Sequence, residues 1–300
     1  MYKKVYEAKN GKFYDRDHYT TIINKTQIGF KENGDILFYL CKNNIKPENR
    51  EDYKKVIKPL AKTKTKNRGS ASGPVDITKF PKNAGILVNK NNIEYTDEKD
   101  RFSVFYRSKD GKFVNRCQSN MVRCGVAGYF DRVAALPCRK VGWSTKNTEK
   151  HKVLEKLAKE IEEGHSLLED SYDFHKKRAE QSEPYLFDGS IYSTMTLNYD
   201  FRTACHKDKG DLIGGLSTLT ILEDIPNNYE GFYTGLPEYK IAFDLRDGDT
   251  LYFDAHEYHA NTDYNVLSDK LPIDDLVNNN FAGRMSVVCY LRDRLHLCGD

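Results

Sequence analysis

The stretch that decides the fold is Tyr199–Asp208, YDFRTACHKD, in which His206 and Asp208 are separated by one residue. It continues an alternating run over 191–201 that predicts a β-strand. In an extended chain, residues i and i+2 point to the same face, so this imidazole and this carboxylate face the same side. Both groups bind transition metals. The stretch therefore predicts part of a metal site beyond the end of a strand.

A second stretch, Gly248–His259, GDTLYFDAHEYH, contains a turn, a strand and two histidines. Two histidines and one carboxylate, with open coordination positions opposite them, form the facial triad of non-haem Fe(II) oxygenases. Either His256 or His259 can complete the pair formed by His206 and Asp208. The residues alone leave this choice open.

A third stretch, Gly283–Tyr290, GRMSVVCY, predicts a strand that opens with Arg284. The planar guanidinium of arginine suits a carboxylate, because it donates two parallel hydrogen bonds to it. Ser286 lies two residues further along the same strand, so it shares the face of Arg284. The order His-x-Asp, distal histidine, Arg-x-Ser is more specific than any one of these parts.

The rest of the chain predicts an α+β fold with a jelly-roll core. Short strands separated by Gly, Asp and Asn turns indicate an antiparallel β-sandwich or jelly roll. Helical spacing appears over 47–60 and over 147–181, where Gly164 is expected to divide two helices. We expect an N-terminal α/β cap over 1–60 and a catalytic domain over 61–300 with a helical insert over 147–181, joined as one unit. Strands are expected over the following ranges: 35–41, 191–201, 213–222, 231–235, 239–243, 250–253 and 284–290.

Composition predicts an intracellular protein without a membrane span. The mean hydropathy is −0.71, and no apolar run approaches the length that crosses a bilayer. The seven cysteines have no framework spacing and are expected to be reduced thiols. His151, His165 and His175 lie in polar helical sequence and are expected at the surface. The net charge is only +3, so contact with nucleic acid would need a local basic patch.

These motifs resemble the TET/JBP family of 2-oxoglutarate- and Fe(II)-dependent dioxygenases, which oxidise the 5-methyl group of pyrimidine bases. The likeness covers about residues 60–295 and is greatest to base-J-type thymine hydroxylases and to algal or viral members. It is carried by the following segments: Thr65–Gly73, Asn198–Asp211, Gly214–Gly215, Leu236–Asp244 and His256–Thr262.

The resemblance implies a ligand set and two cosubstrates. His206, Asp208 and His259 are expected to bind Fe(II); His259 is preferred to His256 because it precedes Thr262 as the superfamily ligand does. 2-Oxoglutarate and O2 are then the cosubstrates, and succinate is a product. Some algal relatives use ascorbate instead of 2-oxoglutarate. The following residues are expected at the 2-oxoglutarate site: Arg284, Ser286 and Asn198.

The resemblance also implies a DNA substrate whose target base flips out of the stack. Asp211 matches the family position that meets the base edge. An ionised aspartate accepts from N3–H of thymine or from the amine of 5-methylcytosine. Asn67, Arg68 and Arg202 are expected near the substrate. Thymine is favoured, to give 5-hydroxymethyluracil, and 5-methylcytosine is the alternative. The implied compartment is the nucleus or cytoplasm, and the resemblance to viral members leaves a viral gene open.

Two other hypotheses remain at this point. The same chemistry can act on a different substrate, such as a free nucleotide or a protein side chain, without DNA binding. Alternatively, the chain is a metal-free β-helix that serves as a binding or structural module. The presence of all four metal- and carboxylate-binding residues disfavours this last hypothesis. The oligomeric state is not indicated.

Overall fold

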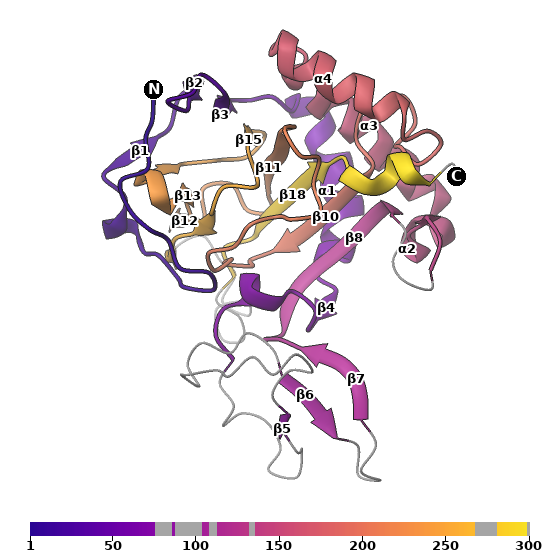
Figure 1. The fold of residues 1–300 in the computed structure, drawn as a ribbon, viewed down its shortest axis with the longest axis horizontal. Helices are drawn as coiled ribbons and strands as arrows, with labels where there is room; N and C mark the ends of the chain where they lie inside the picture. Colours follow the sequence, from indigo (N-terminus) through magenta and orange to yellow (C-terminus); the bar gives the residue numbers. More distant parts are fainter. Residues whose placement is uncertain (76–85, 88–103, 108–112, 132–135, 268–280, 299–300) are drawn as a thin grey trace.

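The computed structural model describes residues 1–75, 86–87, 104–107, 113–131, 136–267 and 281–298 (Figure 1). Its largest sheet has nine strands in the order β2-β3-β15-β11-β18-β10-β8-β4, with β9 paired to β8, and every pairing in it is antiparallel. The strands are β2 (Gln27–Phe30), β3 (Ile36–Cys41), β15 (Thr250–Phe253), β11 (Ser217–Glu223), β18 (Arg284–Tyr290), β10 (Thr194–Tyr199), β8 (Val122–Phe130), β4 (Lys64–Thr65) and β9 (Arg139–Lys140).

A four-stranded sheet packs on one face of the large sheet. Its order is β1-β14-β13-β16, and β1 pairs with β14 in parallel. Side chains of both sheets form one buried cluster, in which Leu251 and Phe253 of β15 meet Leu236 and Phe243 of the small sheet. Two sheets packed face to face, antiparallel apart from the β1–β14 pair, form the expected jelly-roll core. The strands are β1 (Thr21–Ile23), β14 (Ile241–Phe243), β13 (Thr234–Leu236) and β16 (Ala260–Asn261).

Two smaller sheets complete the strands. The pair β12 (Tyr229–Gly231) and β17 (Tyr264–Val266) is antiparallel. The sheet of β5 (Ile86–Leu87), β6 (Val104–Arg107) and β7 (Phe113–Gln118) lies below the main body in Figure 1. Single 3-10 turns occur at η1 (Arg16–His18), η2 (Gly69–Ser72), η5 (Pro237–Tyr239) and η7 (Asp293–Leu297).

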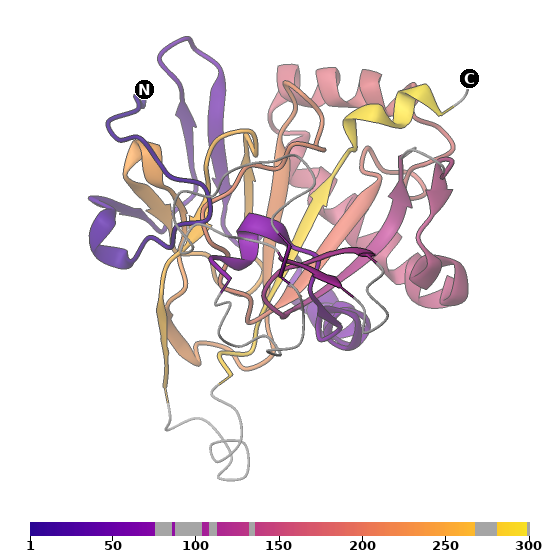
Figure 2. The same ribbon diagram turned by 60° about the horizontal axis from the view of Figure 1, so that its bottom comes forward.

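Helices cover the other face of the large sheet. They are α1 (Pro47–Ala61), α2 (Gly142–Lys146), α3 (Thr148–His165) and α4 (Glu169–Glu180). Figures 1 and 2 show α3 and α4 on the side away from β1 and β13. The predicted α+β architecture, with helices bracing a two-sheet core, is confirmed. Residues 1–60 supply strands to both sheets and α1 to the helical layer.

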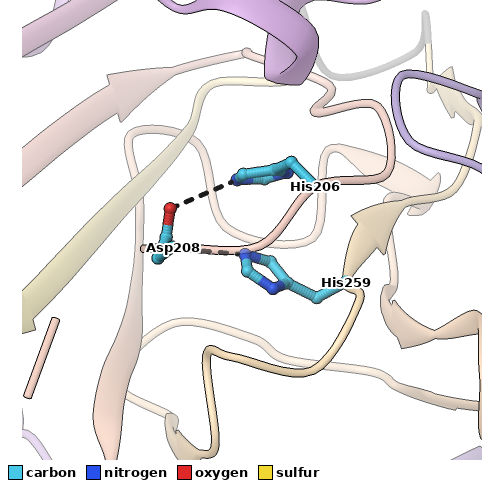
Figure 3. A group of neighbouring side chains, drawn as sticks. All are labelled: His206, Asp208 and His259. Atoms are coloured by element: carbon cyan, nitrogen blue, oxygen red, sulfur yellow. Dashed lines mark ion pairs between the residues drawn. The ribbon is translucent and has the colours of Figure 1, made fainter. Parts of the chain in front are cut away.

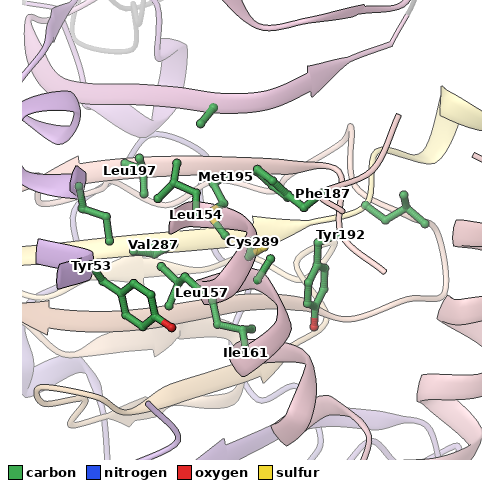
Figure 4. Packing of buried hydrophobic residues seen from close by; sticks show 14 of the residues in the cluster. Tyr53, Leu154, Leu157, Ile161, Phe187, Tyr192, Met195, Leu197, Val287 and Cys289 are labelled. Carbon is green, nitrogen blue, oxygen red and sulfur yellow. The ribbon is translucent and has the colours of Figure 1, made fainter. Parts of the chain in front are cut away.

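Alternation along β18 divides the strand between the helices and the interior of the two sheets. Met285, Val287 and Cys289 are fully buried and pack in the cluster beneath the helices. Figure 4 shows Val287 and Cys289 beside Leu154 and Leu157 of α3. Successive strand residues face opposite ways, so Arg284, Ser286, Val288 and Tyr290 face the other sheet. The helices thus hold a polar strand face in place.

Replacing Leu157 with alanine is expected to cost about 2–5 kcal/mol of unfolding free energy, because its side chain is fully buried under the large sheet and leaves a cavity. Leu167 provides the matched control, since its side chain is 66% exposed. Its replacement with alanine should change stability by less than about 0.5 kcal/mol. Urea denaturation of both variants measures the difference. Equal midpoints would contradict the packing described here.

The boundary between α3 and α4 differs from the prediction. α3 continues through Gly164 to His165, and the break lies at Ser166–Leu168. A Cβ atom on Gly164 would lie 2.2 Å from the Tyr252 hydroxyl oxygen. Glycine is therefore needed for the close approach of α3 to β15 and does not end the helix.

The prediction that His151, His165 and His175 are surface residues is wrong. Their exposed fractions are 1%, 0% and 0%. His165 is held by the Tyr192 hydroxyl, 2.8 Å from Nδ1, and by Ser171, 3.2 Å from Nε2. Polar helical sequence conceals such residues, because a single histidine can lie on the buried face of a helix while its neighbours in sequence face water.

Stability is expected to fall as the pH drops from about 6.5 towards 4. Burial lowers the pKa of His165 to about 4 and also lowers that of His175, whereas an unfolded histidine has a pKa of about 6.5. The unfolded state therefore binds more protons in this interval, so unfolding free energy rises with pH there and is fully recovered above it. Each such histidine contributes a slope of up to about 1.4 kcal/mol per pH unit.

The measurement is urea denaturation of metal-free protein at several pH values between 4.5 and 7.5. His165→Gln keeps hydrogen-bonding groups towards Tyr192 and Ser171 but does not titrate. Its stability should depend less steeply on pH than that of the wild type. Parallel curves for the two proteins would show that His165 does not titrate on unfolding.

The expectation that all cysteines are reduced thiols is wrong for two of them. Cys138 and Cys298 form a disulfide with Cα atoms 5.8 Å apart across 160 residues of sequence. The described free thiols are Cys41, Cys124, Cys205 and Cys289. Two cysteines so far apart in the sequence form no recognisable spacing motif, so the sequence does not reveal that they pair. Disulfides are rare in reducing compartments, so cysteine content no longer supports the expected compartment. No helix in the described ranges is long and apolar enough to cross a membrane.

Candidate metal centre and central cavity

Three side chains from two distant segments converge on one point between the sheets. His206, Asp208 and His259 each offer one ligand atom, and these atoms all lie within 4.8 Å of one another. His206 Nε2 is 3.7 Å from Asp208 Oδ1, and His259 Nε2 is 3.5 Å from Asp208 Oδ2 (Figure 3). Ligand atoms about 2 Å from a shared ion lie about 3–4 Å apart. The spacing therefore suits one metal ion.

Backbone hydrogen bonds set this convergence. The N–H of His206 donates to the carbonyl of His259, and the N–H of His259 donates to the carbonyl of His206, both at 3.0 Å. The N–H of Asp208 donates to the carbonyl of Ala255 at 2.9 Å. The segment after β10 is thus paired with the segment after β15, and the three ligands are held by the main chain.

Both histidines present the correct nitrogen for metal binding. Nδ1 of His206 lies 2.8 Å from the carbonyl oxygen of Ala204, and Nδ1 of His259 lies 3.0 Å from that of Glu257. A carbonyl only accepts, so each Nδ1 carries the proton and each Nε2 keeps its lone pair. Hydrogen bonds of this kind orient histidine ligands in metal sites. The donor set therefore fits Fe(II), which two histidines and one carboxylate bind with open positions.

The charges of the three groups also suit a cation. Burial lowers the pKa of His206 to about 4, and the neighbouring His259 adds to this effect, so the imidazole is neutral. Burial raises the pKa of Asp208, but His259 and His206 outweigh it and hold that pKa well below its usual value. Asp208 is therefore a carboxylate, and 33% of its side chain remains exposed to the central cavity.

The triad opens into the central cavity, which has a volume of about 310 Å³. β18 contributes Ser286, Val288 and Tyr290 to its wall, as expected from the strand face that starts with Arg284. The remaining lining comes from both sheets and from the segment around η2. Lining residues used below are Asn67, Arg68, Ala71, Thr196, Asn198, Phe201, Thr203, Asp211, Leu219, Thr234, Phe253 and Asn261.

One end of the strand face bears unpaired polar atoms beside a buried arginine. Arg284 is 3% exposed, its Nη2 lies 3.5 Å from Thr234 Oγ1, and its Nε has no hydrogen-bond partner among the described residues. Asn198 Nδ2 donates to Ser286 Oγ at 3.1 Å, while its buried Oδ1 has no partner there. A buried donor or acceptor without a partner is costly. These atoms therefore fit a bound polar molecule with a carboxylate at the arginine.

The opposite end of the strand face bears Asp211. Its backbone pairs with Arg292, two residues beyond Tyr290, and its carboxyl accepts a hydrogen bond from the Ser217 hydroxyl. Burial raises the pKa of Asp211 well above its usual value, and Asp208 adds to that effect. A cation bound by the triad would instead lower the pKa of Asp211. A strand rises about 3.3 Å per residue, so Arg284 and Tyr290 lie about 20 Å apart along β18, and Asp211 lies beyond the Tyr290 end.

The loop before η2 reaches the central cavity, as its cationic sequence suggested. Asn67 and Arg68 both line the cavity, and the Ala71 carbonyl accepts the N–H of Ala204 at 2.8 Å. That bond fixes the loop against the segment that carries His206. The loop directly follows β4, and β4 pairs with β8 of the large sheet, so the start of the loop is also held in place.

Three candidate residues are absent from the lining of the central cavity. Arg284 lies next to the lining, since its guanidinium contacts Thr234, which belongs to it. Arg202 forms an ion pair with Asp15, covers the Phe13 ring at 4.7 Å and lines a second, neighbouring cavity. His256 Nδ1 lies 3.4 Å from Asp254 Oδ1, and the residue belongs neither to the triad nor to the cavity lining.

Several lining residues were missed in the sequence. Val288 and Tyr290 follow Arg284 and Ser286 at period two, so strand alternation alone would have found them. Thr203 and Asn261 are joined by a hydrogen bond of 2.7 Å across the sheets. No local pattern signals that pair, because it depends on how the two segments meet.

Comparison with known proteins agrees with this geometry. The family Tet_JBP, described as the oxygenase domain of the 2OGFeDO superfamily, matches residues 125–293. The bifunctional helicase and thymine dioxygenase JBP2 of Leishmania braziliensis is 32% identical over 174 residues, covering 57% of this chain and 14% of that protein. The bifunctional helicase and thymine dioxygenase JBP2 of Trypanosoma brucei brucei is 34% identical over 189 residues, covering 58% of this chain and 15% of that protein. Thymine dioxygenase JBP1 of Trypanosoma brucei brucei is 31% identical over 144 residues, covering 46% of this chain and 16% of that protein.

Among solved structures, NgTET1 in complex with 5mC DNA aligns over 92% of this chain and 85% of that chain, with a TM-score of 0.49 and 12% identity. This chain thus spans about a seventh of the length of the curated relatives it matches. The matched family covers more than half of the chain and includes all three metal-ligand candidates and Arg284. The chain belongs to the Tet_JBP family of 2-oxoglutarate- and Fe(II)-dependent oxygenase domains.

Proposed function

We propose that this protein hydroxylates the 5-methyl group of thymine in DNA, using Fe(II), 2-oxoglutarate and O2, and forms 5-hydroxymethyluracil, succinate and CO2. The observation that carries the proposal is the triad of His206, Asp208 and His259 in the wall of a cavity, with the buried Arg284 next to that wall, beside Thr234. Membership of the Tet_JBP family supports the oxygenase chemistry. The proteins named thymine dioxygenases support the base.

His206, Asp208 and His259 would hold the iron through Nε2, a carboxylate oxygen and Nε2. The iron and 2-oxoglutarate supply the oxidising chemistry. This chain holds both histidines with Nδ1 against a backbone carbonyl, keeps Asp208 charged, and surrounds the site with Leu219 and Phe253, which exclude water.

Arg284 would bind the distal carboxylate of 2-oxoglutarate through its unpaired Nε and a second guanidinium N–H. Ser286 and Asn198 line the cavity beside it and supply a hydroxyl and a free amide oxygen. The presence of this arginine favours 2-oxoglutarate over ascorbate as the cosubstrate. The distal carboxylate of 2-oxoglutarate would also neutralise the buried positive charge of Arg284.

Thymine would enter the central cavity from the end that bears Asp211, after flipping out of the stack. Its methyl group must approach the open side of the triad, so its opposite edge faces outward. An iron ion in the triad favours the ionised form of Asp211, which then accepts from N3–H of thymine. Asn67 and Arg68 line the same cavity and can donate to the base carbonyls or to the backbone.

The same proposal assigns the catalytic unit to residues 61–300, with residues 1–60 bracing it, and places the protein where DNA is found. 5-Methylcytosine remains the second candidate base, because the N4 amine can also donate to Asp211. The two bases differ in the group next to the methyl, which is a carbonyl in thymine and an amine in 5-methylcytosine.

The proposal is tested by incubating the protein with Fe(II), 2-oxoglutarate and thymine-containing duplex DNA in air. Nucleosides are then measured by mass spectrometry, and succinate is measured in parallel. We expect 5-hydroxymethyluracil to form only when 2-oxoglutarate and iron are both present. Succinate formation with unchanged nucleosides would refute DNA thymine as the substrate while leaving the oxygenase assignment intact.

A further inference from the structure

A second cavity of about 400 Å³ adjoins the central cavity and is lined by cationic side chains. We call it the basic cavity. Its wall contains Lys64 of β4, Arg123 of β8, and Tyr199 and Phe201 from β10 and the segment after it. Phe201 lines both cavities, and η2 lies between them, with Ala71 on the central cavity and Ser72 on the basic cavity. One layer of residues therefore separates the two.

Aromatic rings contact Arg123, which lines the basic cavity, and Lys62, which lies outside the lining but over the ring of the lining residue Tyr199. Arg123 lies over the Phe281 ring at 4.1 Å, and Lys62 lies over the Tyr199 ring at 4.4 Å. The two rings contact each other edge to face at 5.9 Å. Cation–π contacts restrict such side chains without neutralising their charge. The charges of Arg123 and Lys62 are thus fixed in position.

Among the described residues, no carboxylate forms an ion pair with Lys62, Lys64 or Arg123. The carboxylate in the cavity wall is Asp200, which accepts the N–H groups of Arg284 at 2.8 Å and Gly283 at 3.2 Å. Burial also raises the pKa of Asp200 to about 6. Arg202, in contrast, already has Asp15 as its partner. Asp200 offsets part of the charge of Arg123, and Arg123 acts to lower the pKa of Asp200, but the cations in the wall of the basic cavity outnumber this carboxylate, so the described lining keeps an excess of positive charge.

A hollow lined by cations and aromatic rings suits the sugar–phosphate backbone of nucleic acid better than an isolated phosphate. The cations attract the phosphate, while the rings provide a surface for the sugar or a neighbouring base. Basic side chains on a protein surface are usually just solvated. Here Lys64 and Arg123 instead line a cavity directly beside the catalytic centre. A nucleotide whose base enters the central cavity must leave its flanking phosphates within reach of an adjoining hollow.

We propose that the basic cavity binds a phosphodiester of the DNA strand that carries the target base, one linkage or a few away from it, through Arg123 and Lys64. This inference rests on the proposed function and adds a backbone-positioning site to it. Such contacts set register and affinity without reading sequence. The overall charge of only +3 is then compatible with DNA binding, because the charge is concentrated beside the active site.

The test replaces Arg123 with glutamine and measures DNA affinity and turnover. Each lost phosphate contact should reduce the slope of log K against log salt by about 0.7–0.9. We expect KM for DNA to rise about tenfold, with KM for 2-oxoglutarate unchanged. Lys64→Gln should act in the same direction. Lys156→Gln removes an exposed lysine of α3, on the helical side, and should change none of these values.

A set of duplexes with one neutral methylphosphonate at successive linkages makes the test specific. Wild-type protein should lose affinity at one or two linkages beside the target thymine, and Arg123→Gln should lose less at those same linkages, because the two changes remove one shared contact. Arg123→Lys should restore most of the affinity. Inorganic phosphate at matched ionic strength should not compete.

Competition by inorganic phosphate alone, with no effect of the methylphosphonates, would replace the proposal with a site for free phosphate. Equal methylphosphonate losses in wild type and Arg123→Gln would overturn it. Loss of folding in Arg123→Gln, seen as a lower urea midpoint, would leave Lys64→Gln as the deciding variant. If the wild type oxidises no DNA at all, the proposed function fails instead, which is a different result.

Discussion

Asp208→Ala is expected to lose stoichiometric Fe(II) binding and to reduce oxidation of DNA by at least about 10³-fold. The variant retains both histidines but no carboxylate. That carboxylate is the one charged ligand of the triad, and its pKa is held well below the usual range by the two imidazoles. Iron held without it has neither the charge balance nor the coordination set of the facial triad. Iron content of anaerobically loaded protein and succinate formation measure the two effects.

His256→Ala is the matched control for this prediction. It removes a histidine three residues before His259, but the structure places that imidazole against Asp254 and outside the triad. Iron binding and turnover should therefore remain within a few fold of wild type. His259→Ala should instead behave like Asp208→Ala. If His256→Ala lost iron and His259→Ala kept it, the assignment of the distal ligand would be reversed.

Arg284→Met should raise KM for 2-oxoglutarate by about 10²-fold or more. The guanidinium is 3% exposed and has an unpaired Nε, so a bound carboxylate would be its main counterion. Removing one partner of a buried, hydrogen-bonded charge pair costs about 2–5 kcal/mol, which is about 30-fold to several thousandfold. Steady-state kinetics at varied 2-oxoglutarate give the value.

Arg202→Met provides the comparison for Arg284→Met. It removes a guanidinium that pairs with Asp15 and lies outside the central cavity. KM for 2-oxoglutarate should not change in this variant. An unchanged KM in Arg284→Met would mean that a different residue binds the distal carboxylate.

Local patterns predicted the parts of the site that belong to one strand or one segment. The i, i+2 spacing of His206 and Asp208 and the alternation that begins at Arg284 are both written in neighbouring residues. Strands 250–253 and 284–290 were predicted with the bounds that β15 and β18 have. Both strands are short and start directly after a turn that contains glycine, so their first residues are well marked.

Features that depend on distant segments could not be predicted in this way. The proximity of His259 to His206 results from a backbone bridge between loops that are 53 residues apart. The Cys138–Cys298 disulfide and the burial of His165 likewise depend on which faces meet. Arg202 was expected near the substrate; its ion pair with Asp15 and its place in the wall of the basic cavity could not be read from the sequence, and its role there stays a prediction. Arg123, which lines the basic cavity, had no motif around it.

The most direct test of the central claim uses a duplex that contains both thymine and 5-methylcytosine, together with ¹⁸O2. The overall reaction joins one oxygen atom to the methyl carbon and the other to succinate. The account predicts ¹⁸O in 5-hydroxymethyluracil, with one succinate formed for each, and unchanged 5-methylcytosine. Label in 5-hydroxymethylcytosine alone would contradict the choice of base, and succinate without any labelled nucleoside would contradict DNA oxidation by this site.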